Sequence, residues 1–413
     1  MIPFFILSPN ARLPLLLTLL LLQLLLLGPA AQATPYLPAS GDQVIEVLPG
    51  GGARQLARLR TALRAQPQDL ALATNLAQRY IALARSDTDP RYLGYAQAVL
   101  QPWWHRPSPP VEVRMLRATL LQSTHHFDAA LKDLDAIVAI TPQHAQAWLT
   151  RATVLTVRGE YAKASASCAR LSSLASELIS IACIANIGSM SGRAVQSEQL
   201  LEKTLQRSAS VAAPELQVWV LTLLAEMATR RGAVSSAEER YLRALALDPK
   251  DSYLLGAYAD FLLDLHRPQE VVKLVNEHSR IDALLLRHAL ALQQIPGSSV
   301  TLAALVEELN DRFNAALQRG DTVHQREQAR FELQLQSNPQ AALALAQKNW
   351  AVQKEAADVR IYLEAALKAN ADAAPVLHWI KSIGLEDVAV ARLAQQLKMQ
   401  LKTQLKTQLK AGA

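Results

Sequence analysis

Small and bulky apolar residues recur along the chain with a period of about 34 residues, which marks a stacked structural repeat rather than one long element. One copy of the pattern begins at Val111 and the next at Ala145, and a later pair begins at Val218 and Ser252. The eighth position holds a small residue in all four copies: Ala118, Ala152, Ala225 and Ala259. The twentieth position is small in the first three: Ala130, Ala164 and Ala237. Bulky residues fill the slots between, so each period predicts two amphipathic helices that approach closely.

Turn and stop signals divide each period into two helices. The fifteenth position holds Gly159 and Gly232 in two copies, and His266 takes that slot in the last one. Pro142 and Pro249 hold the thirty-second position, where the missing amide hydrogen ends a helix. The pattern therefore predicts helix-turn-helix units joined by short loops.

These residues resemble the tetratricopeptide repeat (TPR), a helix-turn-helix unit with this period. The resemblance implies an all-α fold, a right-handed α-solenoid of TPR helix-turn-helix repeats. It places repeats at 111–144, 145–177, 218–251 and 252–280. Looser segments are a leading helix at 54–69, a TPR-like repeat with an insertion at 70–110, a degenerate TPR at 178–217 and degenerate helical repeats at 281–395.

The N-terminal segment 1–33 follows a different pattern. Arg12 precedes an apolar run at 13–27, and the tripeptide Ala31-Gln32-Ala33 follows it. This order is typical of a secretory signal peptide, so we expect cleavage after Ala33 and an N-terminal linker at 34–53. The run of about 15 apolar residues is shorter than the roughly 20 that span a bilayer. The protein is therefore expected to be periplasmic or secreted; the alternative is an uncleaved leader that anchors it in the inner membrane.

Charge and motif content narrow the classes of function. The net charge of +6 is spread over 413 residues without a basic patch that contains aromatic residues, so nucleic acid is not an expected partner. The stretch GSMSG at 188–192 has Met190 where a nucleophile elbow needs serine. PGGGAR at 49–54 lacks the lysine and hydroxyl residue of a phosphate loop. We expect neither enzyme activity nor a cofactor.

The first helices of TPR hairpins line a groove that binds peptides, and the resemblance carries this role to four of the repeats. It implies a groove formed by Met115, Thr119, Gln122, Leu149, Thr153, Trp219, Glu226, Tyr253 and Asp260. Trp219 and Tyr253 would be its aromatic anchors, although Trp219 could equally be a core residue. Protein or peptide ligands are the partners that such a mixed apolar and polar surface predicts.

The window STHHFDAALKDLDA at 123–136 brings together five side chains that could bind a metal or transfer protons: His125, His126, Asp128, Asp133 and Asp135. The repeat frame assigns the two histidines to the turn and lets Asp128 open the second helix, where a carboxylate suits the helix dipole. Asp133 and Asp135 then lie too far along that helix to face the turn. A structural turn is the favoured interpretation, and a site built on His125, His126 and Asp128 is its alternative.

The two cysteines fall in helices that should be neighbours. Cys168 belongs to the second helix of one repeat and Cys183 to the first helix of the next. A disulfide is therefore geometrically feasible, and two buried free thiols are the other interpretation.

The C-terminal tail at 396–413 repeats the motif QLKT. On a helix its leucines form one stripe and its lysines the neighbouring one. This basic amphipathic tail is either a solvated extension of the last helix or a docking helix for a partner or an anionic membrane surface. A membrane contact is expected only through this tail or an uncleaved leader.

The sequence favours a non-enzymatic scaffold or adaptor that binds other proteins in the periplasm, in assembly of an envelope complex. A metal-handling or catalytic protein that uses His125, His126 and Asp128 is one alternative. A purely structural spacer is the other.

Overall fold

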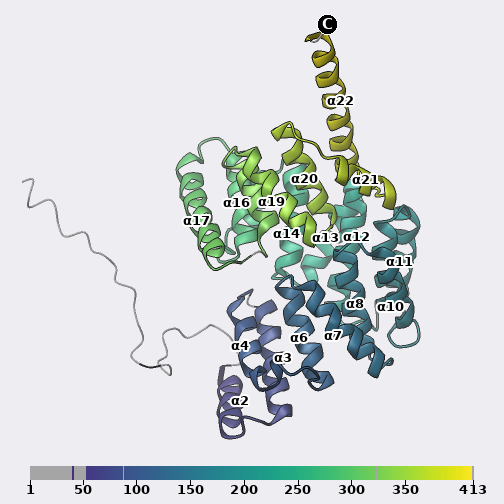
Figure 1. The fold of residues 1–413 in the computed structure, drawn as a ribbon, viewed down its shortest axis with the longest axis vertical. Coiled ribbons are helices and arrows are strands. Elements are labelled where there is room, and N and C mark those ends of the chain that lie inside the picture. The colour runs from purple at the N-terminus through teal and green to yellow at the C-terminus, as the bar shows by residue number, and fades with distance from the viewer. Residues whose placement is uncertain (1–39, 41–52, 87, 322, 412–413) are drawn as a thin grey trace, which may run out of the picture. The chain divides into compact units, whose positions relative to one another are not determined.

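The structure, a computed structural model, describes residues 40, 53–86, 88–321 and 323–411. Every regular element in these residues is a helix, which confirms the predicted all-α fold class (Figure 1). None of the described helices combines the length and the apolar character needed to cross a bilayer. The predicted signal peptide, its cleavage position and nearly all of the linker lie outside the described residues.

The helices follow one another as antiparallel pairs. The first part of the stack contains α2 (Ala53–Ala65), α3 (Leu70–Ser86), α4 (Arg91–Val99) and α5 (Gln101–Trp104). Five hairpins follow: α6 (Val111–Ser123) with α7 (Phe127–Ile140), α8 (Ala145–Val157) with α9 (Tyr161–Leu171), α10 (Glu177–Ser189) with α11 (Ala194–Ser208), α12 (Pro214–Arg230) with α13 (Val234–Leu247), and α14 (Ser252–Asp264) with α15 (Pro268–Val275). The remaining helices are α16 (Asp282–Gln293), α17 (Ser299–Gln318), α18 (Gln325–Gln334), α19 (Pro339–Val352), α20 (Ala356–Ala369), α21 (Ala374–Ile383) and α22 (Val388–Ala411).

Two boundaries differ from those expected. Helix α12 begins at Pro214 rather than at 218, because proline has no amide hydrogen to leave unsatisfied in a first turn. Helix α22 begins at Val388, so the boundary expected at 396 falls inside a helix and the tail continues it.

The turn inside each of the five hairpins passes through one residue in the left-handed region. Their φ angles are +58° at His125, +74° at Gly159, +76° at Gly192, +75° at Gly232 and +55° at His266. Glycine reaches this region without strain, whereas a residue with a Cβ reaches it at a steric cost. The slot that holds glycine or histidine in the sequence is thus the point where the chain reverses.

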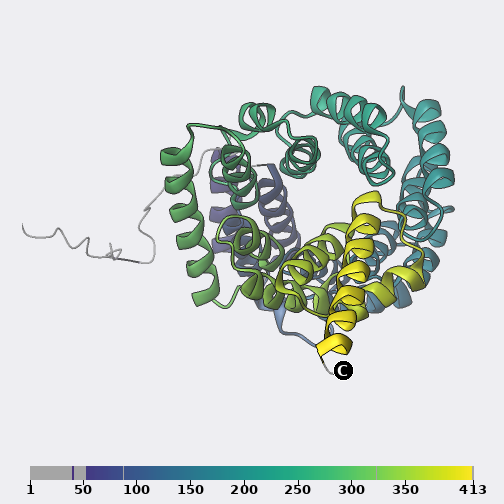
Figure 2. The ribbon, with the colours of Figure 1, turned by 90° about the horizontal axis from the view of Figure 1, so that it is seen from above.

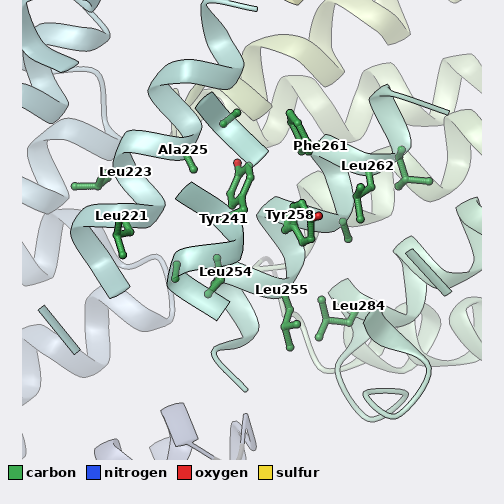
Figure 3. Close-up of a cluster of buried hydrophobic side chains, with 14 of the residues drawn as sticks. Leu221, Leu223, Ala225, Tyr241, Leu254, Leu255, Tyr258, Phe261, Leu262 and Leu284 are labelled. Atoms are coloured by element: carbon green, nitrogen blue, oxygen red, sulfur yellow. The ribbon is translucent and has the colours of Figure 1, made fainter. Parts of the chain in front are cut away.

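Buried alanines let the two helices of a hairpin approach closely. Those at positions eight and twenty are at most 1% exposed: Ala118, Ala130, Ala152, Ala164, Ala225, Ala237 and Ala259. Aromatic rings fill the space between the hairpins α12–α13 and α14–α15 (Figure 3). There the ring centroid of Tyr241 lies 5.3 Å from that of Tyr258 and 5.5 Å from that of Phe261. The core is therefore continuous between these two hairpins.

The hairpins follow a curved path that brings late helices back to early ones (Figure 2). The amide of Lys354 donates to the carbonyl oxygen of Val157 at 2.7 Å, and the amide of Ala194 donates to Glu386 Oε2 at 2.7 Å. Ala356 and Trp379 pack against the apolar cluster of α8, α9 and α10. Residues 54–413 form one unit in which the C-terminal helices contact the middle of the stack.

Candidate binding surface

The nine residues predicted to form a groove all lie on first helices of hairpins. Helix α6 carries three of them, and α8, α12 and α14 carry two each. Thr153 and Tyr253 are exposed, the latter at 61%, and the other seven are half-buried. Their common assignment to a peptide groove stays a prediction.

The α6 and α8 part of this surface offers apolar contacts more than hydrogen bonds. The Thr119 hydroxyl donates to the Met115 carbonyl oxygen at 3.0 Å, and the Thr153 hydroxyl donates to that of Leu149 at 3.1 Å. Because these hydroxyl protons are used within their own helices, a partner would mainly meet methyl groups and the half-buried side chains of Met115 and Leu149.

The two predicted aromatic anchors have different surroundings. Trp219 is half-buried and packs against the apolar core of the middle hairpins, as its interpretation as a core residue implies. The Tyr253 hydroxyl donates to Glu226 Oε1 at 2.7 Å. Desolvation raises the pKa of the Glu226 carboxyl, and the charge of Glu226 raises the pKa of the Tyr253 hydroxyl well above its usual range. Tyr253 is thus an exposed ring held in place by one hydrogen bond.

Asp260 is held by the C-terminal part of the same chain. Its Oδ2 accepts from Arg287 on α16 at 2.5 Å, and its other oxygen pairs with Arg330 on α18. Burial raises the pKa of the Asp260 carboxyl, but the charges of the two guanidinium groups outweigh this effect and hold the pKa well below its usual range. A peptide would have to compete with both arginines for this carboxylate.

The C-terminal segment contacts successive turns of the hairpins. A Cβ added at Gly159 would lie 3.0 Å from Trp379 Cζ2, and one added at Gly192 would lie 3.5 Å from the carbonyl oxygen of Gly384. Gly232 is the next turn residue in the row, and a Cβ there would lie 3.6 Å from Val388. The glycines of the turn slot therefore permit the chain reversal and also the close approach of the C-terminal segment.

A buried polar network holds the start of α20. Asp358 is 1% exposed, accepts from the Glu355 amide at 2.7 Å and from Asn349 at 2.8 Å, and lies 3.5 Å from Arg326. Burial raises the pKa of the Asp358 carboxyl to about 6, although the Arg326 charge opposes the rise. These contacts cap the N-terminus of α20 and join it to α18 and α19, and they give the buried Asp358 carboxylate its hydrogen-bond partners.

The histidine and aspartate window forms the turn and much of the second helix of the hairpin α6–α7. His125 stacks on Phe127 with ring centroids 5.3 Å apart, and burial lowers the pKa of its imidazole. Each aspartate pairs with an arginine outside its own helix: Asp128 with Arg158, Asp133 with Arg117 at 2.6 Å, and Asp135 with Arg151 at 2.7 Å. In the described part of the chain, no three His, Cys, Asp or Glu residues are grouped as metal ligands. Asp128 lies in the first turn of α7, as expected, and it also forms an ion pair with Arg158 that the repeat pattern did not indicate.

A recurrent spacing in the sequence could have revealed part of this polar packing. Position seven of a first helix meets position 23 of the following second helix, as in Arg117 with Asp133. Arg151 donates to Ser167 at the same spacing, and Arg240 donates to the Leu224 carbonyl oxygen. An arginine takes part in all three contacts, at position seven in two repeats and at position 23 in the third, and its partner varies, so a search for repeated charge pairs alone would miss them.

Cys168 and Cys183 form a disulfide that joins α9 to α10. Their Cα atoms are 5.6 Å apart, and both side chains are buried. The bond therefore connects two neighbouring hairpins inside the core.

Helix α22 is attached to the body at its beginning. Leu397 is 2% exposed and packs with Val390 on the apolar cluster of α19 and α20. Leu401, one step further along the leucine stripe, is already 36% exposed, and the neighbouring Lys398 and Lys402 are exposed. Such exposure agrees with the interpretation of the tail as a solvated extension of the last helix.

Alanines buried at positions eight and twenty, with a left-handed residue at position fifteen, are the packing features that the sequence repeat predicted. The chain is an all-α solenoid of TPR-type hairpins. In this TPR-type solenoid the hairpins α6–α7, α8–α9, α12–α13 and α14–α15 span residues 111–140, 145–171, 214–247 and 252–275.

No protein-family model matches the chain, and no curated protein matches it. Solved structures that resemble it include a chain of the APC/C hetero-tetramer Cut9-Hcn1, at a TM-score of 0.40 and 12% identity, over 76% of this chain and 52% of that one. A tetratricopeptide repeat protein from Parabacteroides merdae ATCC 43184 has a TM-score of 0.36 at 12% identity, over 70% of this chain and 98% of its own. Yeast Tom70 has a TM-score of 0.28 at 10% identity, over 85% and 89%. At these values no residue, ligand or partner is carried over to the TPR-type solenoid.

Proposed function

We propose that this chain is a non-enzymatic scaffold that binds other proteins in the bacterial cell envelope, in assembly of an envelope complex. The observation that carries the proposal is the exposed ring of Tyr253, fixed by Glu226 on a first helix of the solenoid. Aromatic side chains that are accessible and already ordered are favoured contacts in protein interfaces, because little conformational entropy is lost when they bind.

The accessible partner surface is proposed to extend from α6 through α8 and α12 to Tyr253. Asp260 marks its limit, because Arg287 and Arg330 already occupy that carboxylate. Protein ligands would contact Met115, Leu149 and Tyr253 mainly through apolar and aromatic groups.

The proposed location is the periplasm, reached by cleavage after Ala33. Two features support it: the leader pattern at 1–33 and the disulfide between Cys168 and Cys183. Disulfides persist in oxidising compartments and are rare in a reducing cytoplasm. Fractionation of the expressing bacterium tests this part, and a full-length precursor recovered only from the cytoplasm would contradict it.

Affinity capture from envelope extract tests the scaffold role. The tagged chain is expected to retain one or more proteins reproducibly, and Tyr253→Ala is expected to reduce their recovery. Val300→Ala, at a site 84% exposed on α17, is the matched control and should leave recovery unchanged. Equal recovery with all three chains would favour a structural spacer over a scaffold that uses this surface.

A further inference from the structure

An open apolar hollow lies at the N-terminal end of the solenoid, away from the residues predicted to form the groove. It has a volume of about 560 Å³ and lies between α2, α3, α4 and α5. Its apolar lining includes Leu63 of α2, Tyr80 of α3, and Tyr95 and Val99 of α4. This volume falls within the roughly 300–1,000 Å³ of sites that bind small molecules or anchor side chains.

The hollow exists because α2 covers the end of the stack incompletely. None of the α2 residues from 54 to 65 is buried, and its three leucines, Leu56, Leu59 and Leu63, are only half-buried. By contrast, Tyr80 on the next helix is 4% exposed. A terminal helix that leaves its apolar face partly uncovered provides one wall of a site rather than a closed core.

Two tyrosine rings form the opposite wall. The ring centroids of Tyr80 and Tyr95 are 5.6 Å apart with their planes tilted by 53°. Tyr95 is 45% exposed, so the hollow is open to solvent on the α4 side. An entering apolar side chain would contact mainly the exposed Tyr95 ring, with the buried Tyr80 ring behind it, while the rest of its chain stayed in water.

The polar groups of the hollow are basic. Arg60 and Arg64 line it from one face of α2, and no carboxylate is among the described residues that line it. Arg60 and Tyr80 line the same hollow, and the charge of Arg60 opposes the rise that burial causes in the pKa of the Tyr80 hydroxyl. A guanidinium has five N–H donors, and Arg60 is exposed, so it can bind an anion at the rim of the hollow.

We propose that this hollow binds an extended segment of a partner protein that carries an aliphatic or aromatic residue next to Asp or Glu. The apolar side chain would enter between Leu63, Tyr80 and Tyr95, and the adjacent carboxylate would pair with Arg60. Charge complementarity selects the acidic residue, and the open α4 side suits an extended chain. The inference rests on the proposed scaffold role, but it uses a surface separate from Tyr253 and Trp219.

Selection from a random nine-residue peptide library on the purified chain tests the proposal. Selected peptides are expected to contain an aliphatic or aromatic residue flanked by acidic ones. Arg60→Glu is expected to weaken their binding by about tenfold or more, because it replaces a charge-assisted pair with repulsion. Tyr95→Ala should also weaken it. Fluorescence anisotropy with the selected peptides, labelled with fluorescein, measures both effects.

Arg58→Glu is the matched control, because Arg58 is exposed on the same helix and does not line the hollow. It should leave peptide binding unchanged, and helical content and unfolding midpoint should match across the variants. Selection of no peptides, selection of peptides without acidic residues, or binding insensitive to Arg60→Glu would each overturn the proposal. Tight binding of a dansylated C11 fatty acid that is lost in Arg60→Glu, without any peptide selected, would overturn it in favour of an anionic amphiphile.

The outcome is separable from that of the scaffold proposal. If Tyr253→Ala abolishes capture from envelope extract while no peptide binds the hollow, the scaffold role stands and this inference fails. If peptides bind through Arg60 but capture is insensitive to Tyr253→Ala, the hollow is supported and the proposed groove surface fails.

Discussion

At the scale of single residues, position fifteen of the repeat, in the turn of each hairpin, can be restricted in two ways: by a left-handed backbone and by a close neighbour from the C-terminal segment. Gly159 has a φ of +74°, which a residue with a Cβ adopts only with strain. Because glycine has no Cβ, Trp379 can also approach closely: a Cβ added at Gly159 would lie 3.0 Å from Trp379 Cζ2. The same slot holds His125 and His266 in other hairpins, so a left-handed turn by itself does not require glycine here.

Gly159→Ala should therefore destabilise the protein more than Gly232→Ala does. Both variants carry the left-handed strain of about 1–2 kcal/mol. In Gly232→Ala the added Cβ would make only an ordinary contact with Val388 at 3.6 Å, whereas Gly159→Ala adds a steric conflict with Trp379. Urea unfolding of the two variants measures the difference, and equal midpoints would contradict the close packing at Gly159.

The two ion pairs of Asp260 should make the stability of the folded chain depend on pH. The pKa of Asp260 in the folded state lies below the ordinary value of 3.8, so the ionised carboxylate stabilises the fold above that value and the contribution is lost as the pH falls below it. The difference in melting temperature between the wild-type chain and Asp260→Asn is expected to shrink from pH 6 towards pH 3. Asp311→Asn, at an exposed position on α17, is the control. A difference that stays constant over this range would contradict the double ion pair.

At the scale of elements, neighbouring hairpins are joined by apolar packing and, at one junction, by a covalent bond. The disulfide between Cys168 and Cys183 connects α9 and α10, with a sequence separation of 15 residues. Closing a loop of that length restricts the unfolded chain and contributes about 3 kcal/mol in the chain-entropy account.

Replacing both cysteines with alanine should lower the free energy of unfolding by about 3 kcal/mol. Denaturant unfolding of the double variant beside the oxidised wild-type chain measures it. The unfolded, unreduced wild-type chain should also react with no thiol reagent, because both cysteines are bonded in the described structure. Two reactive thiols would contradict the bond.

The elements themselves were largely predictable, because the signals that specify them are local. Ala152 and Gly159 lie within one hairpin, and each marks a helix contact or a turn without reference to distant residues. Contacts of the C-terminal segment were not predictable in this way. Glu386 accepts from the amide of Ala194, 192 residues earlier, and no periodic pattern connects the two.

The candidate surface was predictable only in part for a related reason. The repeat frame placed Tyr253 and Asp260 on first helices, and the structure agrees. It could not indicate that Arg330, from a degenerate helix 70 residues later, would pair with Asp260. The hollow beside Tyr80 was also missed, because it results from the incomplete packing of α2 rather than from a motif.

At the scale of the whole unit from residue 54 to 413, contacts of the C-terminal helices with the middle of the stack should prevent the two regions from opening independently. In a simple solenoid each repeat contacts only its neighbours, so the ends can open without affecting the middle. Here Trp379 packs on Tyr161 at 6.2 Å and on Trp350 at 5.0 Å between ring centroids. Opening of the C-terminal helices should therefore expose the turn between α8 and α9.

Trp379→Ala tests this coupling by hydrogen exchange. Amide exchange is expected to increase in α20 and α21 and also around residues 157–161, because the indole ring of Trp379 packs against both the C-terminal helices and Tyr161. Trp104→Ala on α5 is the control and should raise exchange only near its own helix. An effect of Trp379→Ala confined to the C-terminal helices would show that the two regions open independently.

The contacts between the C-terminal segment and the turns also fix how many hairpins lie between the turns at Gly159 and Gly232. Trp379, Gly384 and Val388 meet the turns at Gly159, Gly192 and Gly232 in the same order along the chain. An open solenoid can gain or lose a repeat at the cost of one interface. In this chain a hairpin inserted between Gly159 and Gly232 would move the later turns away from their contacts, so evolution could lengthen this stretch only by changing the C-terminal segment with it.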